Sequence, residues 1–266
     1  MSELNTKDKK IERRQFLRQA LRVGKGLAYA ALLNLLPRKL RAAGEISKFE
    51  WTQLIYRGEW DPRPGASKRL MWELMKRTSV EAKLEPAGIR LTDETLFYHP
   101  FLCLAGTQEF PAFSEEEIRI LRRYLSLGGF MLIDDCRGAG NSGFAQSVQR
   151  EVTRLFPQSS WERLREDHTV LRSFYLLDRA AGRVLVNPYL EGINIEDRTP
   201  IIYSPNDLSG AWARDDFGNW EYEVVPGGET QREMAFRLGI NIVMYALAVN
   251  YKRDQIHQPF IMQRKR

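Results

Sequence analysis

Short apolar runs alternate with segments of helical spacing through this chain after residue 44. Residues 49–56 alternate apolar and polar positions, and residues 101–106, 130–133 and 200–203 are compact apolar runs typical of buried strands. Apolar residues recur at helical spacing over 67–78, 118–125, 144–156 and 229–249. Strands that alternate with helices predict an α/β domain in three layers, α/β/α, around an open, mostly parallel sheet of about five strands.

The boundaries of one helix are marked in the sequence. Ser114 is a good N-cap residue, and Glu117 completes a capping box at the start of the helix. Gly128 and Gly129 end that helix before the run at 130–133. Leu96–Tyr98 reads as a short strand or a turn.

The N-terminal 44 residues have the pattern of an export leader. Arg13 and Arg14, followed by Phe16 and Leu17, resemble the twin-arginine (Tat) motif, and the apolar run 27–36 is too short to span a membrane. A cleavage site of small residues ends at residue 44. The alternatives are a basic amphipathic helix on a membrane surface and an uncleaved leader that tethers the protein. We expect a partner in the Tat translocase and a periplasmic or otherwise exported location.

The charge distribution argues against nucleic-acid binding. The formal charge of the chain is +6, but residues 1–44 hold 11 of the 40 basic and 3 of the 34 acidic residues. The remaining residues, 45–266, therefore carry a net charge of −2. The basic pI therefore belongs to the leader.

We divide the chain into the leader 1–44, a domain 45–251 without a membrane span, and a short basic tail 252–266. Two cysteines, Cys103 and Cys136, form no disulfide framework and no zinc pattern, and we predict no metal site.

Several segments resemble one family, that of domain of unknown function 4159 (DUF4159). The resemblance covers about residues 48–250. It implies a flavodoxin-like fold of the class I glutamine-amidotransferase-like superfamily and brings no established activity or cofactor. His99 and Thr169 depart from the family pattern without affecting the fold expectation. The segments that carry the resemblance are YHPFLCLAG at 98–106, LRRYLSLGGFMLIDD at 121–135, and LGINIVMYA at 238–246.

The candidate ligand site lies where parallel strands end, because open α/β sheets bind ligands beyond the carboxyl ends of their strands. Neighbouring residues of a strand face opposite sides, so Asp134 and Asp135 should have different partners, one a helix or loop and the other a ligand. The competing interpretation is that both acids cap loops or pair with arginines inside the protein, and a Mg²⁺ or Ca²⁺ site would need more oxygen ligands than these two acids supply. The predicted ligand-binding residues are Gly106, Thr107, Asp134, Asp135, Arg137, Gly138, Gly140 and Ser204.

A catalytic alternative uses Cys136 as a nucleophile, His168 as its base, and Asp134 or Asp135 as the acid. The flanking residues weaken it, since a nucleophile elbow needs small residues on both sides and Asp134 takes one of those positions. A neighbouring carboxylate also disfavours the thiolate. A structural histidine is the competing interpretation of His168, and Asp167 could cap the helix that follows.

The glycine-rich loop Gly138–Gly143 matches a dinucleotide-type spacing between a strand and a helix, which suggests anion binding. A dinucleotide-binding loop normally follows the first strand of the fold, and this loop does not. A flexible loop is therefore the simpler interpretation. Residues 212–220 suggest an exposed hairpin.

We interpret the chain as an exported protein of unknown activity, a non-catalytic binding or interaction module. The alternatives are a Cys/His hydrolase or amidase and a binder of small ligands or anions. The sequence identifies no cofactor, ligand, protein partner or oligomeric state.

Overall fold

The computed structural model describes residues 48–263, with side chains through residue 248. The export motif at Arg13, Arg14, Phe16 and Leu17 lies outside the described residues. Five strands run parallel in the spatial order β2-β1-β3-β4-β7, which is the flavodoxin-like order. Their bounds are β1 (Thr52–Leu54), β2 (Ala87–Ile89), β3 (Phe101–Gly106), β4 (Phe130–Asp135) and β7 (Arg198–Ser204).

Two antiparallel strands extend this sheet beyond β7, namely β6 (Glu191–Ile195) and β5 (Glu162–Arg163). The described sheet therefore has seven strands rather than the expected five. The predicted number of strands is too small in part because β5 is an exposed pair of charged residues without an apolar run.

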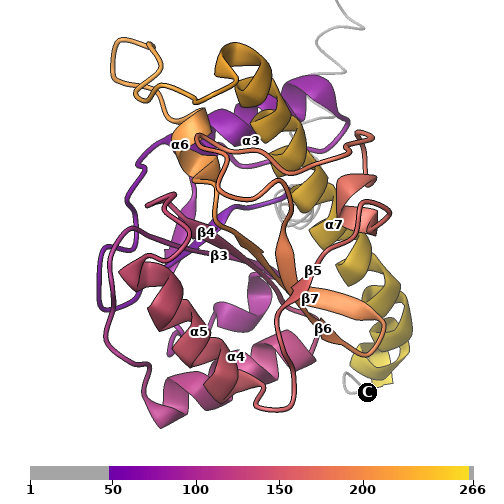
Figure 1. Ribbon diagram of the computed structural model, residues 1–266. Helices are drawn as coiled ribbons and strands as arrows, with labels where there is room; N and C mark the ends of the chain where they lie inside the picture. Colours follow the sequence, from indigo (N-terminus) through magenta and orange to yellow (C-terminus); the bar gives the residue numbers. More distant parts are fainter. Residues whose placement is uncertain (1–47, 264–266) are drawn as a thin grey trace, which may run out of the picture. The chain divides into compact units, whose positions relative to one another are not determined.

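Helices cover both faces of the sheet, as predicted (Figure 1). One face packs against α3 (Ala66–Arg77), α6 (Leu208–Trp212) and α7 (Gly228–Gln263), and the other packs against α4 (Glu115–Ser126) and α5 (Gly143–Leu155). The strands alternate between these two cores. In β4, Phe130 and Leu132 belong to the first core, while Met131 and Ile133 belong to the second. Burial on both faces explains why the central strands are apolar throughout.

The predicted capping box is present at the start of α4, where the backbone N–H of Glu117 donates to Ser114 and the backbone N–H of Ser114 donates to Glu117. Leu96–Tyr98 forms a 3-10 turn, which selects the turn over the strand. Two other expectations change. A second 3-10 turn, Thr169–Leu171, is capped by His168 and not by Asp167.

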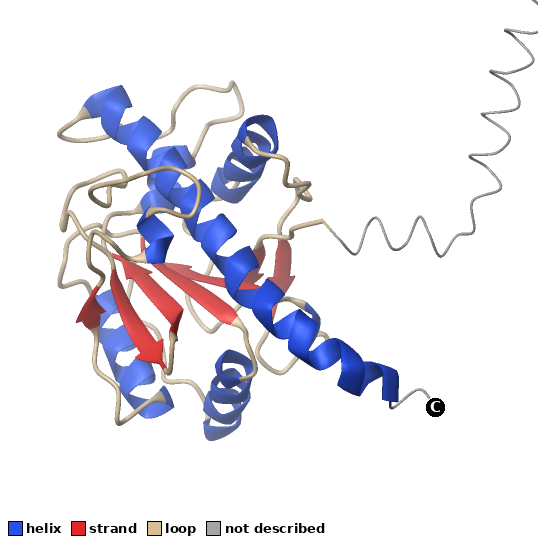
Figure 2. Ribbon diagram, turned by 90° about the vertical axis from the view of Figure 1, so that its right-hand side faces the viewer, coloured by secondary structure: helices blue, strands red, loops and turns tan. Residues whose placement is uncertain are grey.

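The second change concerns the last helix, which continues through the predicted boundary between the domain and the tail at residue 251. Figure 2 shows α7 crossing one face of the sheet and extending beyond it. The apolar spacing fades after residue 249, but residues 250–258 contain no glycine or proline that would end a helix. Within the described part of the chain, no helix is both long enough and apolar enough to cross a membrane.

Candidate functional site

The adjacent carboxylates Asp134 and Asp135 end strand β4 and face opposite sides of the sheet, as predicted. Both side chains are fully buried. Asp134 faces the α6 side, and Asp135 faces the α5 side. Neither is exposed toward a ligand, so the expectation that one of them contacts a ligand is not supported by the geometry.

Asp134 holds the start of helix α6. Its two carboxylate oxygens accept the backbone N–H groups of Leu208 (2.9 Å) and Ser209 (2.8 Å). Burial, together with the nearby Asp207 carboxylate, raises the pKa of Asp134 to about 6. The hydrogen bonds from Ser209 and Leu208 act in the opposite direction and lower this pKa, but their effect is smaller. Asp134 is therefore an internal helix anchor.

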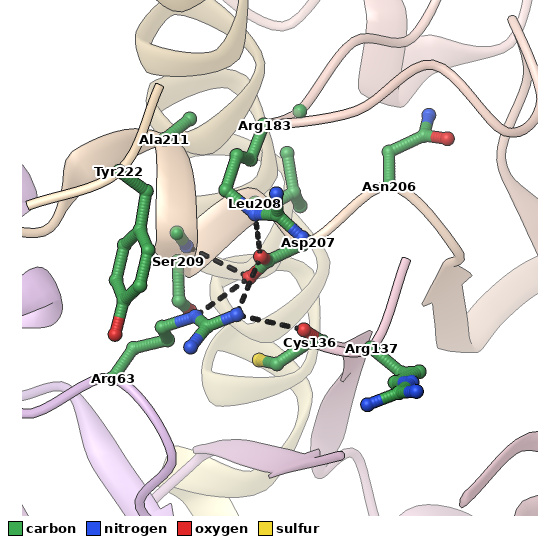
Figure 3. Close-up of polar contacts among 12 residues, drawn as sticks. Arg63, Cys136, Arg137, Arg183, Asn206, Asp207, Leu208, Ser209, Ala211 and Tyr222 are labelled. Atoms are coloured by element: carbon green, nitrogen blue, oxygen red, sulfur yellow. Dashed lines mark hydrogen bonds and ion pairs between the residues drawn. The ribbon is translucent and has the colours of Figure 1, made fainter. Parts of the chain in front are cut away.

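Asp207 is the centre of a buried ionic cluster (Figure 3). Its backbone is left-handed, with φ of 52°. The carboxylate accepts hydrogen bonds from Arg63 Nε (3.1 Å) and Nη2 (2.8 Å), from Arg183 Nε, and from the backbone N–H of Gly210. Two guanidinium groups thus converge on one carboxylate that is itself fully buried. The cluster ties the loops around residues 63 and 183 to the end of the sheet.

Cys136 packs inside this cluster and is not accessible. Its side chain is buried, and its Sγ lies 3.5 Å from Asp134 Oδ2. Desolvation, then the Asp134 carboxylate, raises the pKa of the thiol well above its usual range. The carbonyl oxygen of Cys136 accepts a hydrogen bond from Arg63. A buried neutral thiol of this kind is a packing residue.

The ligand atoms of Asp134, Cys136 and Asp207 lie within 4.8 Å of one another, which is close enough to consider a metal. The donor set does not fit one, because the carboxylate oxygens are already directed at backbone N–H groups and guanidinium groups. A cation would also have to displace Arg63 and Arg183.

The structure does not bring His168 to Cys136. The Nε2 of His168 lies 3.0 Å from the Thr199 hydroxyl, at the start of β7, and its Nδ1 accepts the backbone N–H of Val170. Cys136 follows the end of the parallel neighbour β4, where Asp134 pairs with Ser204. Five residues of strand separate Thr199 from Ser204, or about 16 Å. The Cys/His arrangement of the hydrolase alternative is therefore not formed.

Asp135 already occupies the position that an anion would take at the glycine-rich loop. Its carboxylate accepts hydrogen bonds from the Arg137 N–H (2.9 Å), the Ser142 hydroxyl (2.6 Å) and the Tyr203 hydroxyl (3.1 Å). Ser142 in turn caps helix α5. Because an internal carboxylate takes these donors, the loop offers little to an external anion.

The crevice between β1 and β3, the usual ligand position in this strand order, is filled by side chains. A Cβ at Gly106 would lie 2.4 Å from the Phe144 ring and 2.5 Å from the Tyr56 hydroxyl. That hydroxyl donates to the carbonyl of Ala105, and Thr107 donates to Glu59. Gly106 and Thr107 thus allow close packing at this edge rather than ligand access.

The remaining predicted residues divide between packing and solvent. Ser204 is buried, and Gly138 lies against Val184, to which an added Cβ would come within 2.5 Å. Arg137 is exposed and points away from the ionic cluster (Figure 3). Gly140 is the predicted ligand residue that lines an open cavity of about 460 Å³.

That cavity, which we call the Trp161 pocket, has a volume of about 460 Å³. It lies between the first turns of α5 and the β5–β6–β7 edge of the sheet, beside the glycine-rich loop. Trp161 packs against Tyr203 with ring centroids 5.7 Å apart. The lining residues are Gly140, Asn141, Ala145, Gln146, Val148, Gln149, Trp161, Glu191 and Tyr203.

Sequence reasoning missed most of this pocket because its residues come from four separate segments. A weak signal existed in Tyr203, the last residue of the predicted run 200–203 and the penultimate residue of β7, and hence near the carboxyl edge of the sheet. Trp161 precedes β5, a strand of two residues that is too short to predict, and Glu191 begins β6, which the apolar pattern did not identify. The hairpin expected at 212–220 is present, closed by an antiparallel bridge between Arg214 and Trp220, and does not line the pocket.

A family model described as a domain of unknown function (DUF4159) matches residues 50–247. No curated protein matches the chain.

Proposed function

Because the chain belongs to the DUF4159 family, whose description names no activity, we propose its function from the geometry of the described domain. The protein is an exported, non-catalytic module, on an amidotransferase-like scaffold, that binds a small molecule in the Trp161 pocket. The reactive groups Asp134, Cys136 and Asp207 are buried and satisfied by internal partners, whereas an open pocket lies on the α5 side of the sheet, and this contrast carries the proposal.

The pocket has the composition of a small-molecule site. Its volume falls within the range of ligand pockets, and it combines an aromatic wall with a few polar groups that could orient a ligand. The amides of Asn141, Gln146 and Gln149 offer both donors and acceptors. The same lining contains no nucleophile paired with a base, which favours binding over hydrolysis.

Native mass spectrometry of the exported protein, purified from an exporting host, tests ligand binding. We expect a reproducible adduct on the wild type that is absent from Gln149→Trp, since an indole at this exposed position of α5 fills the pocket without entering the core. Arg119→Trp is the matched control, because Arg119 is exposed on α4 and lies outside the pocket. An adduct that survives Gln149→Trp, or the absence of any adduct, contradicts the proposal.

The leader supports the export part of the proposal. The paired arginines with Phe16 and Leu17 resemble the motif that the Tat translocase reads, and this route carries folded proteins. The ion pairs of this domain join segments that are distant in the sequence, so they form only when the domain folds. Export in the folded state allows them to form in the cytoplasm.

Replacing both arginines by lysine tests export. We expect the double variant Arg13→Lys, Arg14→Lys to accumulate in the cytoplasm, because lysine keeps the charge but loses the guanidinium groups of the motif. Cell fractionation measures the outcome. Lys9→Arg, which changes a basic residue before the motif, is the control and should be recovered in the periplasm like the wild type. Equal periplasmic recovery of the double variant refutes the Tat route.

A further inference from the structure

The Trp161 pocket contains a carboxylate without a countercharge. Glu191 lies at the start of β6, half-buried, and burial raises the pKa of its side chain. Among the described side chains, residues 48–248, none forms a hydrogen bond or an ion pair with this carboxylate. A partly buried charge normally finds a partner, so this one is available to a ligand.

A second carboxylate lies behind the pocket wall. Tyr203 lines the pocket, and its hydroxyl donates to Asp135, whose other partners are the neutral Arg137 N–H and Ser142 hydroxyl. Burial raises the pKa of the Tyr203 hydroxyl, and the charges of Asp135 and Glu191 raise it further. Both carboxylates therefore act on the same wall of the pocket and contribute a negative potential there.

One candidate for an internal countercharge is Arg163. It lies opposite Glu191 in the β5–β6 ladder, so the two side chains share a face of the sheet. The Arg163 guanidinium instead stacks over the Tyr189 ring, 4.3 Å from the ring centroid, and is not within ion-pair distance of Glu191. It is not among the lining residues, which include no lysine or arginine.

The aromatic wall completes the arrangement. Trp161 is half-buried, and its ring packs at a tilt of 55° against Tyr203, so part of the indole borders the cavity. Indole is the side chain that attracts cations most strongly through its ring face. A negative potential, an unpaired carboxylate and an indole within one pocket discriminate against anions.

We propose, on the basis of the binding function above, that the Trp161 pocket takes a small organic cation whose ammonium group contacts Trp161 and pairs with Glu191. The apolar part of such a ligand packs on Val148 and Ala145, and its polar substituents bond to the amides of α5. This assignment excludes ligands that carry no positively charged group.

Choline and its uncharged isostere dimethylbutanol, in which carbon replaces the nitrogen, test the proposal by calorimetric titration of the full chain. We expect choline to bind at least about tenfold more tightly than the isostere, since the two differ only in charge. Glu191→Gln should weaken choline binding by about tenfold and leave the isostere unchanged. Glu162→Gln is the control, because Glu162 is an exposed carboxylate of β5 that bonds to Asn194.

Any of three results would overturn the cation assignment. They are equal affinities for the two probes, no choline binding at millimolar concentration, and an unaltered choline affinity in a folded Glu191→Gln variant. The failure of the assignment and that of the binding function are distinguishable. An adduct that Gln149→Trp removes, without any choline response, leaves a ligand-binding pocket whose ligand is not an organic cation. No adduct and no response to either probe removes both proposals.

Discussion

We expect Asp207→Asn to lower the free energy of unfolding by about 3–5 kcal/mol, the range for breaking a buried ion pair by removing one partner. The substitution keeps the size of the side chain, and asparagine tolerates the left-handed backbone at this position. It removes the charge that Arg63 and Arg183 share, and it turns one acceptor oxygen into a donor. Both guanidinium groups would then be partly buried without a countercharge.

Urea denaturation at neutral pH measures this effect. Asp167→Asn is the matched control, because Asp167 pairs with Arg165 on the exposed surface and should change stability by no more than about 0.5 kcal/mol. A loss below about 1 kcal/mol for Asp207→Asn would show that Arg63 and Arg183 find other partners or water. The buried cluster would then be incidental to the fold.

Asp134→Asn should change the pH dependence of stability as well as stability itself. At neutral pH we expect a loss of about 1–3 kcal/mol, because an amide can accept only one of the two N–H groups at Leu208 and Ser209. The pKa of Asp134 is raised to about 6 in the folded protein, so the folded state binds this proton more tightly than the unfolded state. The contribution of Asp134 to stability therefore increases as the pH falls from about 7 toward 4.

Asparagine cannot titrate, so the difference in stability between wild type and Asp134→Asn should grow on acidification, by about 2 kcal/mol between pH 7 and pH 4.5. Taking this difference cancels the contributions of the other carboxylates, which are common to both proteins. Denaturation curves at several pH values in this window provide the measurement. A difference that stays constant, or shrinks, would mean that Asp134 is ionised across the whole range.

The sequence by itself determined the layers of this fold. Apolar runs at 101–106 and 130–133 required a sheet covered on both sides, and the capping box at Ser114 placed the start of α4. The alternation of a strand also placed Asp134 and Asp135 on opposite faces. These features are local, because the periodicity of a segment records which of its sides is buried.

Only the tertiary structure decided what the sheet edge contains. The ion pair between Arg63 and Asp207 joins residues 144 positions apart, and His168 and Cys136 lie at opposite ends of the sheet although sequence motifs suggested a pair. The Trp161 pocket exists because α5 packs beside an antiparallel extension whose shortest strand has two residues. Periodicity does not specify which element a buried side meets. The partners of a charge, and the space left beside them, follow from packing between distant segments.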